Sequence, residues 1–118
     1  MLTTNDPYVT FWRQKQAEQQ AHYQQLAAQA RDDAGRIATM LREQFQAQQI
    51  ILFGSLAKNR FSDTSDIDLA VSGVAPESFF TALAEANRLT PFQVDLKPIE
   101  ALDPHFLARV RATGEVLG

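Results

Sequence analysis

Residues 50–71 read IILFGSLAKNRFSDTSDIDLAV, and this stretch decides the fold. Its apolar start, Ile50–Phe53, is typical of a short β-strand, which Gly54-Ser55 closes. The residues that follow the serine are compatible with one helical turn. Ile67–Val71 alternates in polarity along its length and predicts a second strand. The stretch therefore predicts two strands that are joined by a turn and a loop.

Helices are predicted on both sides of these strands. Residues 11–48 contain no proline and are rich in Ala, Gln, Glu, Arg and Leu, which favour helix. We expect helix over residues 8–48, either as one long helix or as two, with Asp32 or Asp33 capping the second and Gly35 as the joint. The remaining expected elements are a helix over residues 76–88, a strand over 92–96, a helix over 104–113 and a short strand at 116–117.

This order of elements predicts the fold class. Strands separated by helices indicate an α+β (mixed α/β) architecture built on one sheet. We expect a small mixed β-sheet packed by helices, together with a long N-terminal helix. A chain of 118 residues is long enough for one such sheet domain.

The composition excludes several classes of protein. The chain contains no cysteine, which excludes disulfides, a thiolate nucleophile and Cys-ligated zinc or iron–sulfur sites. Its net charge of -3 argues against direct binding of nucleic acid. No apolar run is long enough to cross a membrane, and residues 1–7 lack the apolar core of a secretory signal. We therefore expect a cytoplasmic protein.

Charge and glutamine are unevenly distributed along the chain. Residues 1–49 carry five acidic and five basic side chains, so the excess negative charge lies in residues 50–118. Eleven of the twelve glutamines lie between residues 14 and 49. The N-terminal part also has a thin apolar seam that includes Trp12, Tyr23 and Leu26. We interpret this seam as core packing, and docking against another helix, in a homodimer or a heteromeric complex, is the alternative.

Three aspartates at predicted strand ends form the candidate catalytic group. Because residues two apart in a strand share a face, Asp66 and Asp68 are predicted to project side by side. Asp95 lies in the third predicted strand, and the three carboxylates converge if that strand neighbours the second. Clustered carboxylates repel one another unless a cation binds between them. Mg²⁺ prefers such hard oxygen ligands, and two ions can clamp the attacking and leaving oxygens of a phosphoryl displacement.

Gly54-Ser55 offers a complementary cradle for phosphate. The glycine lets a phosphate approach the backbone closely, the turn that follows has free N–H groups, and the serine hydroxyl is a further donor. Lys58 and Arg60 lie just beyond and can neutralise phosphate charge. A phosphate cradle beside a metal site predicts transfer of a nucleotidyl or phosphoryl group.

These residues carry a resemblance to a known family. Gly54-Ser55, ten intervening residues and Asp66-Ile67-Asp68 resemble the signature of the DNA polymerase β-like nucleotidyltransferase superfamily. The longer string over residues 52–71 resembles the minimal nucleotidyltransferase group (MNT, MntA-like). Lys58 stands where many members have Arg, which keeps the charge without the bidentate fork. Asn59 stands where many have Gly, and asparagine tolerates left-handed geometry.

The resemblance implies an organisation and a role for each candidate residue. It covers about residues 35–118 as a nucleotidyltransferase domain and leaves residues 1–34 as a helical extension. Asp66 and Asp68 would bind the two Mg²⁺ ions that carry ATP, while Asp95 would complete the second metal site and help to activate an acceptor hydroxyl. The implied nucleotide-binding residues are Gly54, Ser55, Lys58, Arg60 and Ser65.

In the toxin–antitoxin members of the group, the acceptor is a tyrosine of a HEPN-domain toxin. The resemblance therefore implies an antitoxin that transfers AMP from ATP to its toxin and silences the toxin's RNase activity. Two alternatives stay open. One is a small-molecule nucleotidyltransferase of the aminoglycoside type, which usually carries an extra helical substrate domain. This chain is too short to contain one, so a separate subunit would have to supply it. The other is a catalytically vestigial antitoxin that neutralises its partner by contact through the N-terminal helix.

Overall fold

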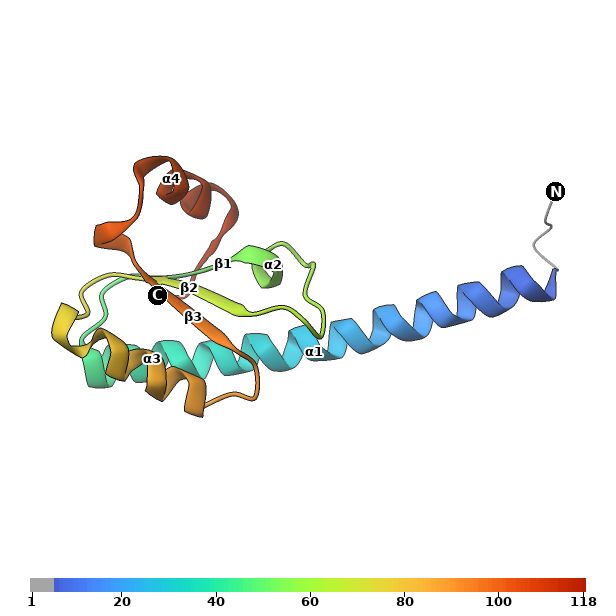
Figure 1. Cartoon of the computed structure of the whole chain (residues 1–118), viewed down its shortest axis with the longest axis horizontal. Coiled ribbons are helices and arrows are strands. Elements are labelled where there is room, and N and C mark those ends of the chain that lie inside the picture. The colour runs from blue at the N-terminus through green and yellow to red at the C-terminus, as the bar shows by residue number, and fades with distance from the viewer. Residues whose placement is uncertain (1–5) are drawn as a thin grey trace.

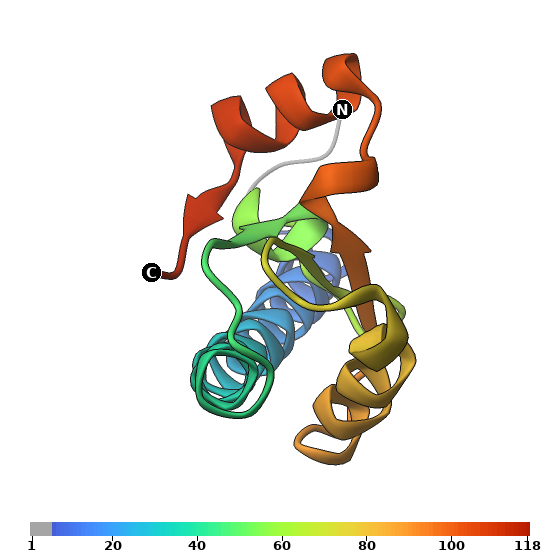
Figure 2. The same ribbon diagram turned by 90° about the vertical axis from the view of Figure 1, so that its left-hand side faces the viewer.

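Two apolar runs of the sequence form the middle of a four-stranded sheet in the computed structural model, which describes residues 6–118. The sheet separates two helical layers, with α4 on one face and α1 and α3 on the other (Figures 1 and 2). In chain order the elements are α1 (Pro7–Phe45), β1 (Ile50–Phe53), α2 (Gly54–Ala57), β2 (Ile67–Val71), the 3-10 turn Pro76–Ser78, α3 (Phe79–Arg88), β3 (Val94–Pro98), the 3-10 turn Ile99–Ala101, α4 (Pro104–Thr113) and β4 (Glu115–Val116).

The sheet is mixed, as its sequence predicts. Its strand order is β3-β2-β1-β4, with β1 antiparallel to both of its neighbours and β2 parallel to β3. The parallel pair is joined through α3, which is the crossover that parallel strands require. The predicted α+β class with a small mixed sheet is therefore confirmed.

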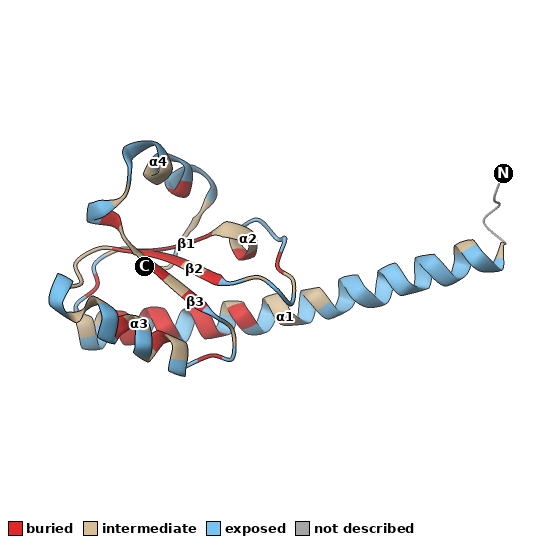
Figure 3. Cartoon of the chain, viewed as in Figure 1, coloured by how far each residue is buried: buried red, intermediate tan, exposed pale blue. Residues whose placement is uncertain are grey.

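Residues 7–45 form one helix, and the alternative of two helices is wrong. The helix begins at Pro7, where the Asp6 carboxylate accepts a hydrogen bond of 2.8 Å from the Tyr8 backbone N–H. It ends at Gln46, which adopts the left-handed conformation of a C-cap. Only its C-terminal part lies against the sheet, and most of the N-terminal part, residues 7–29, projects away from it (Figure 3). Leu26 and Ala27, near the end of this part, are partly buried against the core. We call residues 7–29 the arm.

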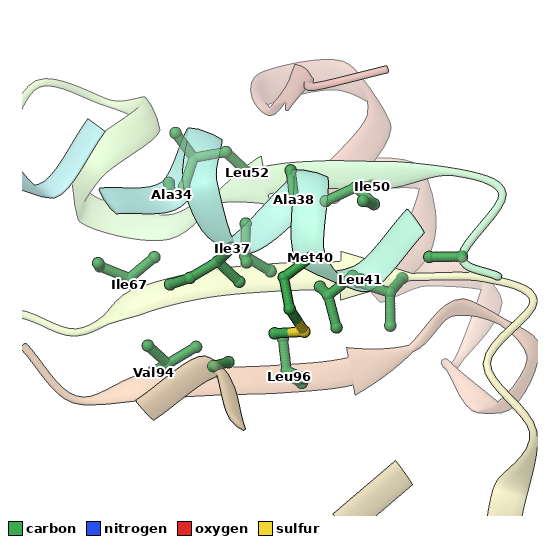
Figure 4. Close-up of a cluster of buried hydrophobic side chains, with 14 of the residues drawn as sticks. Ala34, Ile37, Ala38, Met40, Leu41, Ile50, Leu52, Ile67, Val94 and Leu96 are labelled. Atoms are coloured by element: carbon green, nitrogen blue, oxygen red, sulfur yellow. The ribbon is translucent and has the colours of Figure 1, made fainter. Parts of the chain in front are cut away.

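The main core lies between α1, α3 and the inner face of the sheet. Ile37 and Leu41 of α1 are fully buried and belong to one cluster with Ile67 of β2 (Figure 4). Leu69 of β2 is part of the same cluster. Burial of this apolar surface is the main favourable term in folding. The second face carries a smaller cluster of buried side chains under α4, which consists of Ile51, Phe53, Ala70, Ile99 and Val110.

The buried carboxylate of Asp33 links α1 to the segment that follows α3. Asp33 is completely buried and accepts hydrogen bonds from Thr90 Oγ1 at 2.6 Å and from Gln29 Nε2 at 3.0 Å. It is also paired with the guanidinium of Arg36. Asp33 is therefore not a helix cap, because its partners are a residue far along the chain and neighbours within one unbroken helix.

Replacement of Asp33 by alanine is expected to lower the free energy of unfolding by about 2–4 kcal/mol, because it leaves the buried Thr90 hydroxyl without its acceptor. Urea unfolding of the two proteins measures this difference. Asp32→Ala is the matched control, since its side chain is exposed on the same helix, and a change within about 0.5 kcal/mol is expected. Equal losses in the two variants would show that the hydrogen bonds of Asp33 contribute nothing specific.

Several predicted boundaries differ from those in the structure. The third strand spans Val94–Pro98 rather than 92–96, because Phe92 turns out of the ladder and packs edge-on against Phe61 with ring centroids 5.3 Å apart. The predicted helix over 76–88 begins as a 3-10 turn and becomes α-helical at Phe79. The last strand is Glu115–Val116 rather than 116–117.

No helix within residues 6–118 has the length and apolar character needed to span a membrane. Residues 1–5, on which part of the prediction about a secretory signal rests, lie outside the described residues.

Candidate active site

The structure brings two of the three predicted carboxylates into register. Asp68 in β2 and Asp95 in β3 are direct partners across the parallel ladder. Their strand neighbours Ile67, Leu69 and Val94 point into the core below the sheet, so the two aspartates lie on the opposite face, which α4 covers in part. Asp66 lies one residue before β2 and is exposed. β3 therefore neighbours β2, which is the arrangement that the sequence analysis needed for Asp95 to approach Asp68.

Asp68 is the electrostatically perturbed member of this group. Its half-buried position and the nearby charges of Asp95 and Asp66 raise its pKa from 3.8 to about 6, while the ammonium of Lys97 acts in the opposite direction. Clustering of negative charge in a partly desolvated site is a common mark of catalytic or cation-binding positions.

Lys97 is a member of the site that the sequence analysis missed. Its ammonium nitrogen lies 3.3 Å from Oδ2 of Asp95. The signal was available, because residues two apart in a strand share a face and Lys97 follows Asp95 at that spacing. The lysine offsets part of the negative charge and holds one edge of the Asp95 carboxylate.

Gly54 is required by the position of Asp68. Its φ of +74° is unfavourable for other residues, and a Cβ there would overlap Oδ2 of Asp68 and lie 3.2 Å from its Cγ. The missing side chain thus leaves the space that the carboxylate occupies. Ser55 follows in the short helix α2, whose N-cap residue Phe53 offers no capping side chain. The first N–H groups of α2 are therefore not engaged by a cap.

Arg31, a second residue that the sequence analysis missed, contacts the short helix α2 that follows β1. Arg31 of α1 donates a hydrogen bond of 3.0 Å to the carbonyl oxygen of Leu56 in α2. Its other terminal nitrogen lies 2.8 Å from Glu115 in β4. The arginine therefore connects the long helix, the turn after β1 and the last strand. Nothing in the local sequence reveals contacts between segments so far apart along the chain.

The other predicted nucleotide-binding residues are less closely gathered. Lys58 and Arg60 are exposed on the loop after α2, and between them Asn59 adopts the left-handed conformation that its residue type tolerates. Arg60 lines an open groove beside α1 rather than the face that carries Asp68. The hydroxyl of Ser65 accepts a hydrogen bond of 3.0 Å from the Ser62 backbone N–H, so it serves the loop turn.

The donor set at this face suits a hard divalent cation. Carboxylate oxygens are the preferred protein ligands of Mg²⁺. The pKa of Asp68 is raised first by burial and then by the charges of Asp95 and Asp66, and a bound cation would offset those charges. Within residues 6–118, however, no group of three or more His, Asp or Glu side chains is arranged closely enough to hold a metal ion by itself. Mg²⁺ typically takes one or two carboxylates and completes its shell with water and substrate phosphates, so the Asp68–Asp95 pair fits such a site.

The perturbed pKa of Asp68 has a consequence for stability. Because the folded state binds its proton more tightly than the unfolded state, stability falls as the pH rises from about 4 to about 6. We expect Asp68→Asn to unfold roughly 4 °C above the parent at pH 7.5, for a gain of about 1 kcal/mol after allowance for solvent screening. The difference should vanish at pH 4. Thermal unfolding at both pH values, with and without Mg²⁺, is the measurement, and an advantage that persists at pH 4 would contradict this origin.

The carboxylates of Asp68 and Asp95 thus lie beside the glycine turn at Gly54 on a small mixed sheet. The family model described as Polymerase beta, Nucleotidyltransferase matches residues 35–118. The chain belongs to this family, and the resemblance seen in its sequence is confirmed. A comparison with curated proteins finds none that matches this chain.

Solved structures of toxin–antitoxin proteins share the fold. The crystal structure of the toxin–antitoxin MntA–HepT aligns with a TM-score of 0.59 at 22% identity and covers 75% of this chain and 71% of that chain. A toxin–antitoxin structure with AMP-PNP aligns with a TM-score of 0.62 at 21% identity, over 73% of this chain and 72% of that chain. The crystal structure of a toxin–antitoxin MntA–HpeT mutant with two Asp-to-Glu substitutions aligns with a TM-score of 0.61 at 22% identity and covers 70% of this chain and 70% of that chain.

Proposed function

We propose that this protein transfers AMP from ATP to a hydroxyl group of a partner protein, a HEPN-type toxin, and thereby acts as its antitoxin. The observation that carries the proposal is the register of Asp68 with Asp95 beside Gly54, in a chain of the nucleotidyltransferase family. The toxin partner is inferred from likeness to MntA–HepT, and the use of an adenine nucleotide from likeness to the structure with AMP-PNP.

The proposed reaction is a single displacement at the α-phosphorus of ATP. The acceptor oxygen, for which we propose a tyrosine hydroxyl, forms a bond to that phosphorus, and the bond to the bridging oxygen of the β-phosphate breaks, releasing pyrophosphate. The hydroxyl proton passes to a carboxylate, for which Asp95 is the candidate. Asp68 and Asp95 would hold Mg²⁺, with Asp66 as a further proposed ligand, and the bound ion would supply neutralisation of the triphosphate charge.

The remaining proposed roles, phosphate binding and positioning of the carboxylates, belong to other residues of the chain. Backbone N–H groups of the turn at Gly54 and Ser55 bind phosphate oxygens, because the glycine leaves room for close approach. Lys97 keeps the Asp95 carboxylate in place through its ion pair. Lys58 and Arg60 lie on a loop and would reach the phosphates only by a change of side-chain rotamer, and Ser65 contributes to the shape of that loop.

We further propose that residues 35–118 are the catalytic domain and residues 1–34 a helical extension. The family model begins at residue 35, in the interior of α1. The reaction is assigned to the cytoplasm, where ATP and Mg²⁺ are available. Asp68 and Asp95 are both present, and the residue beside Asp68 is Gly54, whose missing side chain leaves room for the Asp68 carboxylate. This combination favours an active enzyme over a vestigial one.

The test is to incubate the purified protein with the product of its neighbouring gene, ATP labelled on the α-phosphate, and Mg²⁺. Label should appear on the neighbour and the toxicity of the neighbour should fall. Asp66→Ala combined with Asp68→Ala should abolish both effects. If the double variant still neutralises the partner without labelling it, the protein acts by contact alone. Labelling of aminoglycosides instead of the neighbour would establish the small-molecule alternative.

A further inference from the structure

The arm exposes aromatic side chains that the domain does not cover. Tyr8, Phe11 and Trp12, near its start, are 63%, 52% and 50% exposed. Figure 3 shows most of this part of α1 as exposed. Tyr8 and Phe11 each meet Trp12 edge-on, with ring centroids 6.1 Å and 5.7 Å away. Most of the stability of a helix in a protein comes from packing of its apolar face, so a projecting helix with an exposed aromatic end gains from a partner.

One stripe of the arm has the spacing of a coiled-coil seam. Along Val9, Trp12, Gln16, Gln19 and Tyr23, successive residues are separated by alternating steps of three and four, and the same steps continue through Leu26 and Ala30 into the buried face of α1. The face that packs on the sheet in the second half of the helix therefore continues as an uncovered seam in the first half.

The outer half of this seam is complementary to itself. When two copies run antiparallel about a two-fold axis between residues 17 and 18, Trp12 of each lies opposite Tyr23 of the other. The same axis sets Gln16 opposite Gln19 and Val9 opposite Leu26. Apolar residues thus meet apolar residues, and amides meet amides, which carry both a donor and an acceptor and can pair with their own kind.

Charge is compatible with this arrangement. The arm carries only Arg13, Lys15 and Glu18 as charged side chains. On one flank of the seam Lys15 lies near His22 of the other copy, and on the other flank Arg13 lies near Gln20. Glu18 lies on the outer surface, so no like charges are opposed. A neutral amide face of this kind has no charge preference for an acidic or basic partner.

A groove of the domain runs along part of this seam. An open hollow of about 730 Å³ lies between the arm and residues 59–62, with Gln16, Gln19, Tyr23 and Ala27 along the arm side and Phe61 on the loop side. Three of these residues, Gln16, Gln19 and Tyr23, belong to the seam, so the hollow leaves this part of the seam open to a second copy.

We propose that the arm is a dimerisation element, in which two copies of this chain pair their seams antiparallel, with Trp12 packed on Tyr23 of the other copy and the Gln16–Gln19 layer fixing the register. Such an interface is isologous, so each contact occurs twice. It leaves the Asp68–Asp95 face of each copy open, because that face lies on the opposite side of the sheet from α1.

The oligomeric state of the full chain tests this proposal. Light scattering after gel filtration should give twice the chain mass of 13.2 kDa at micromolar concentrations. Trp12→Glu should weaken the dimer by about 100-fold or more, because a central aromatic is lost at two symmetry-related places. Phe11→Glu is the matched control, since Phe11 is equally exposed but lies off the seam, and it should remain dimeric.

Crosslinking tests the direction of pairing, and the chain has no cysteine of its own. A mixture of Gln16→Cys with Gln19→Cys should form a disulfide between unlike chains, whereas a parallel pair would crosslink each variant with itself. A monomeric parent, equal effects of the two glutamate variants, or an arm that is protected only when the toxin partner is present would each overturn the proposal. None of these measurements depends on nucleotidyl transfer.

Discussion

Replacement of Asp68 by asparagine is expected to lower the rate of AMP transfer by about 10³-fold, because it removes the negative charge closest to the centre of the carboxylate group. The same variant is expected to be more stable than the parent at neutral pH. A gain in stability together with a loss of activity is expected when carboxylates that the reaction needs repel one another in the folded protein. Initial rates with labelled ATP and saturating acceptor measure the loss.

Asp63→Asn is the control for this substitution. Asp63 is exposed in the loop before β2 and is not part of the strand pairing, so Asp63→Asn removes one negative charge away from Asp68 and Asp95. The rate of AMP transfer by this variant should stay within about twofold of the parent rate, as for an ordinary surface substitution. If the two variants lost activity equally, net charge rather than the position of Asp68 would be responsible. Full activity in Asp68→Asn would remove this carboxylate from the proposed mechanism.

Replacement of Gly54 by alanine is expected to lower transfer by about 100-fold, since misplacement of a catalytic group by about 1 Å has an effect of this size. The new Cβ would overlap the carboxylate oxygen of Asp68, and the backbone would keep a φ of +74° that alanine disfavours. A loss of about 1–2 kcal/mol in unfolding free energy should accompany the change. Rates and urea unfolding on the same preparation separate the two effects.

Gly35→Ala is the matched control for this second substitution. Gly35 lies in the middle of α1, and a Cβ there would have nothing within 4 Å. Alanine is favoured over glycine in a helix, so we expect up to about 1 kcal/mol of added stability and unchanged activity. Unchanged activity in Gly54→Ala as well would mean that the turn has room for a side chain and does not position Asp68.

The strands and the fold class were predictable because their patterns are local. The apolar run Ile50–Phe53 and the alternation of Ile67–Val71 depend only on neighbouring residues, and both strands occur at the predicted positions. The continuity of α1 was not predictable. Asp33 resembles a helix cap in sequence, but its hydrogen-bond partner is Thr90, which only the tertiary structure brings near.

Much of the candidate site was predictable, and the missing parts have a common cause. The spacing of Gly54, Asp66 and Asp68 indicated both the chemistry and the family. The support from Arg31 was not visible, since its contacts with Leu56 and Glu115 join three separate segments. The exposure of Trp12 corrects the interpretation of the apolar seam as core, because the sheet is too short to reach that end of the helix.

The unbroken course of α1 restricts how the arm can change in length. A helix advances 1.5 Å and turns 100° for each residue, so one residue inserted between the arm and Ala30 would rotate the aromatic end by about 100° relative to the catalytic domain. An insertion of seven residues would return it to within about 20° of its first direction. Additions that keep this direction therefore recur near whole numbers of turns, as with seven or about 11 residues. An intermediate addition would leave the paired seams unchanged but turn each catalytic domain to another side of them.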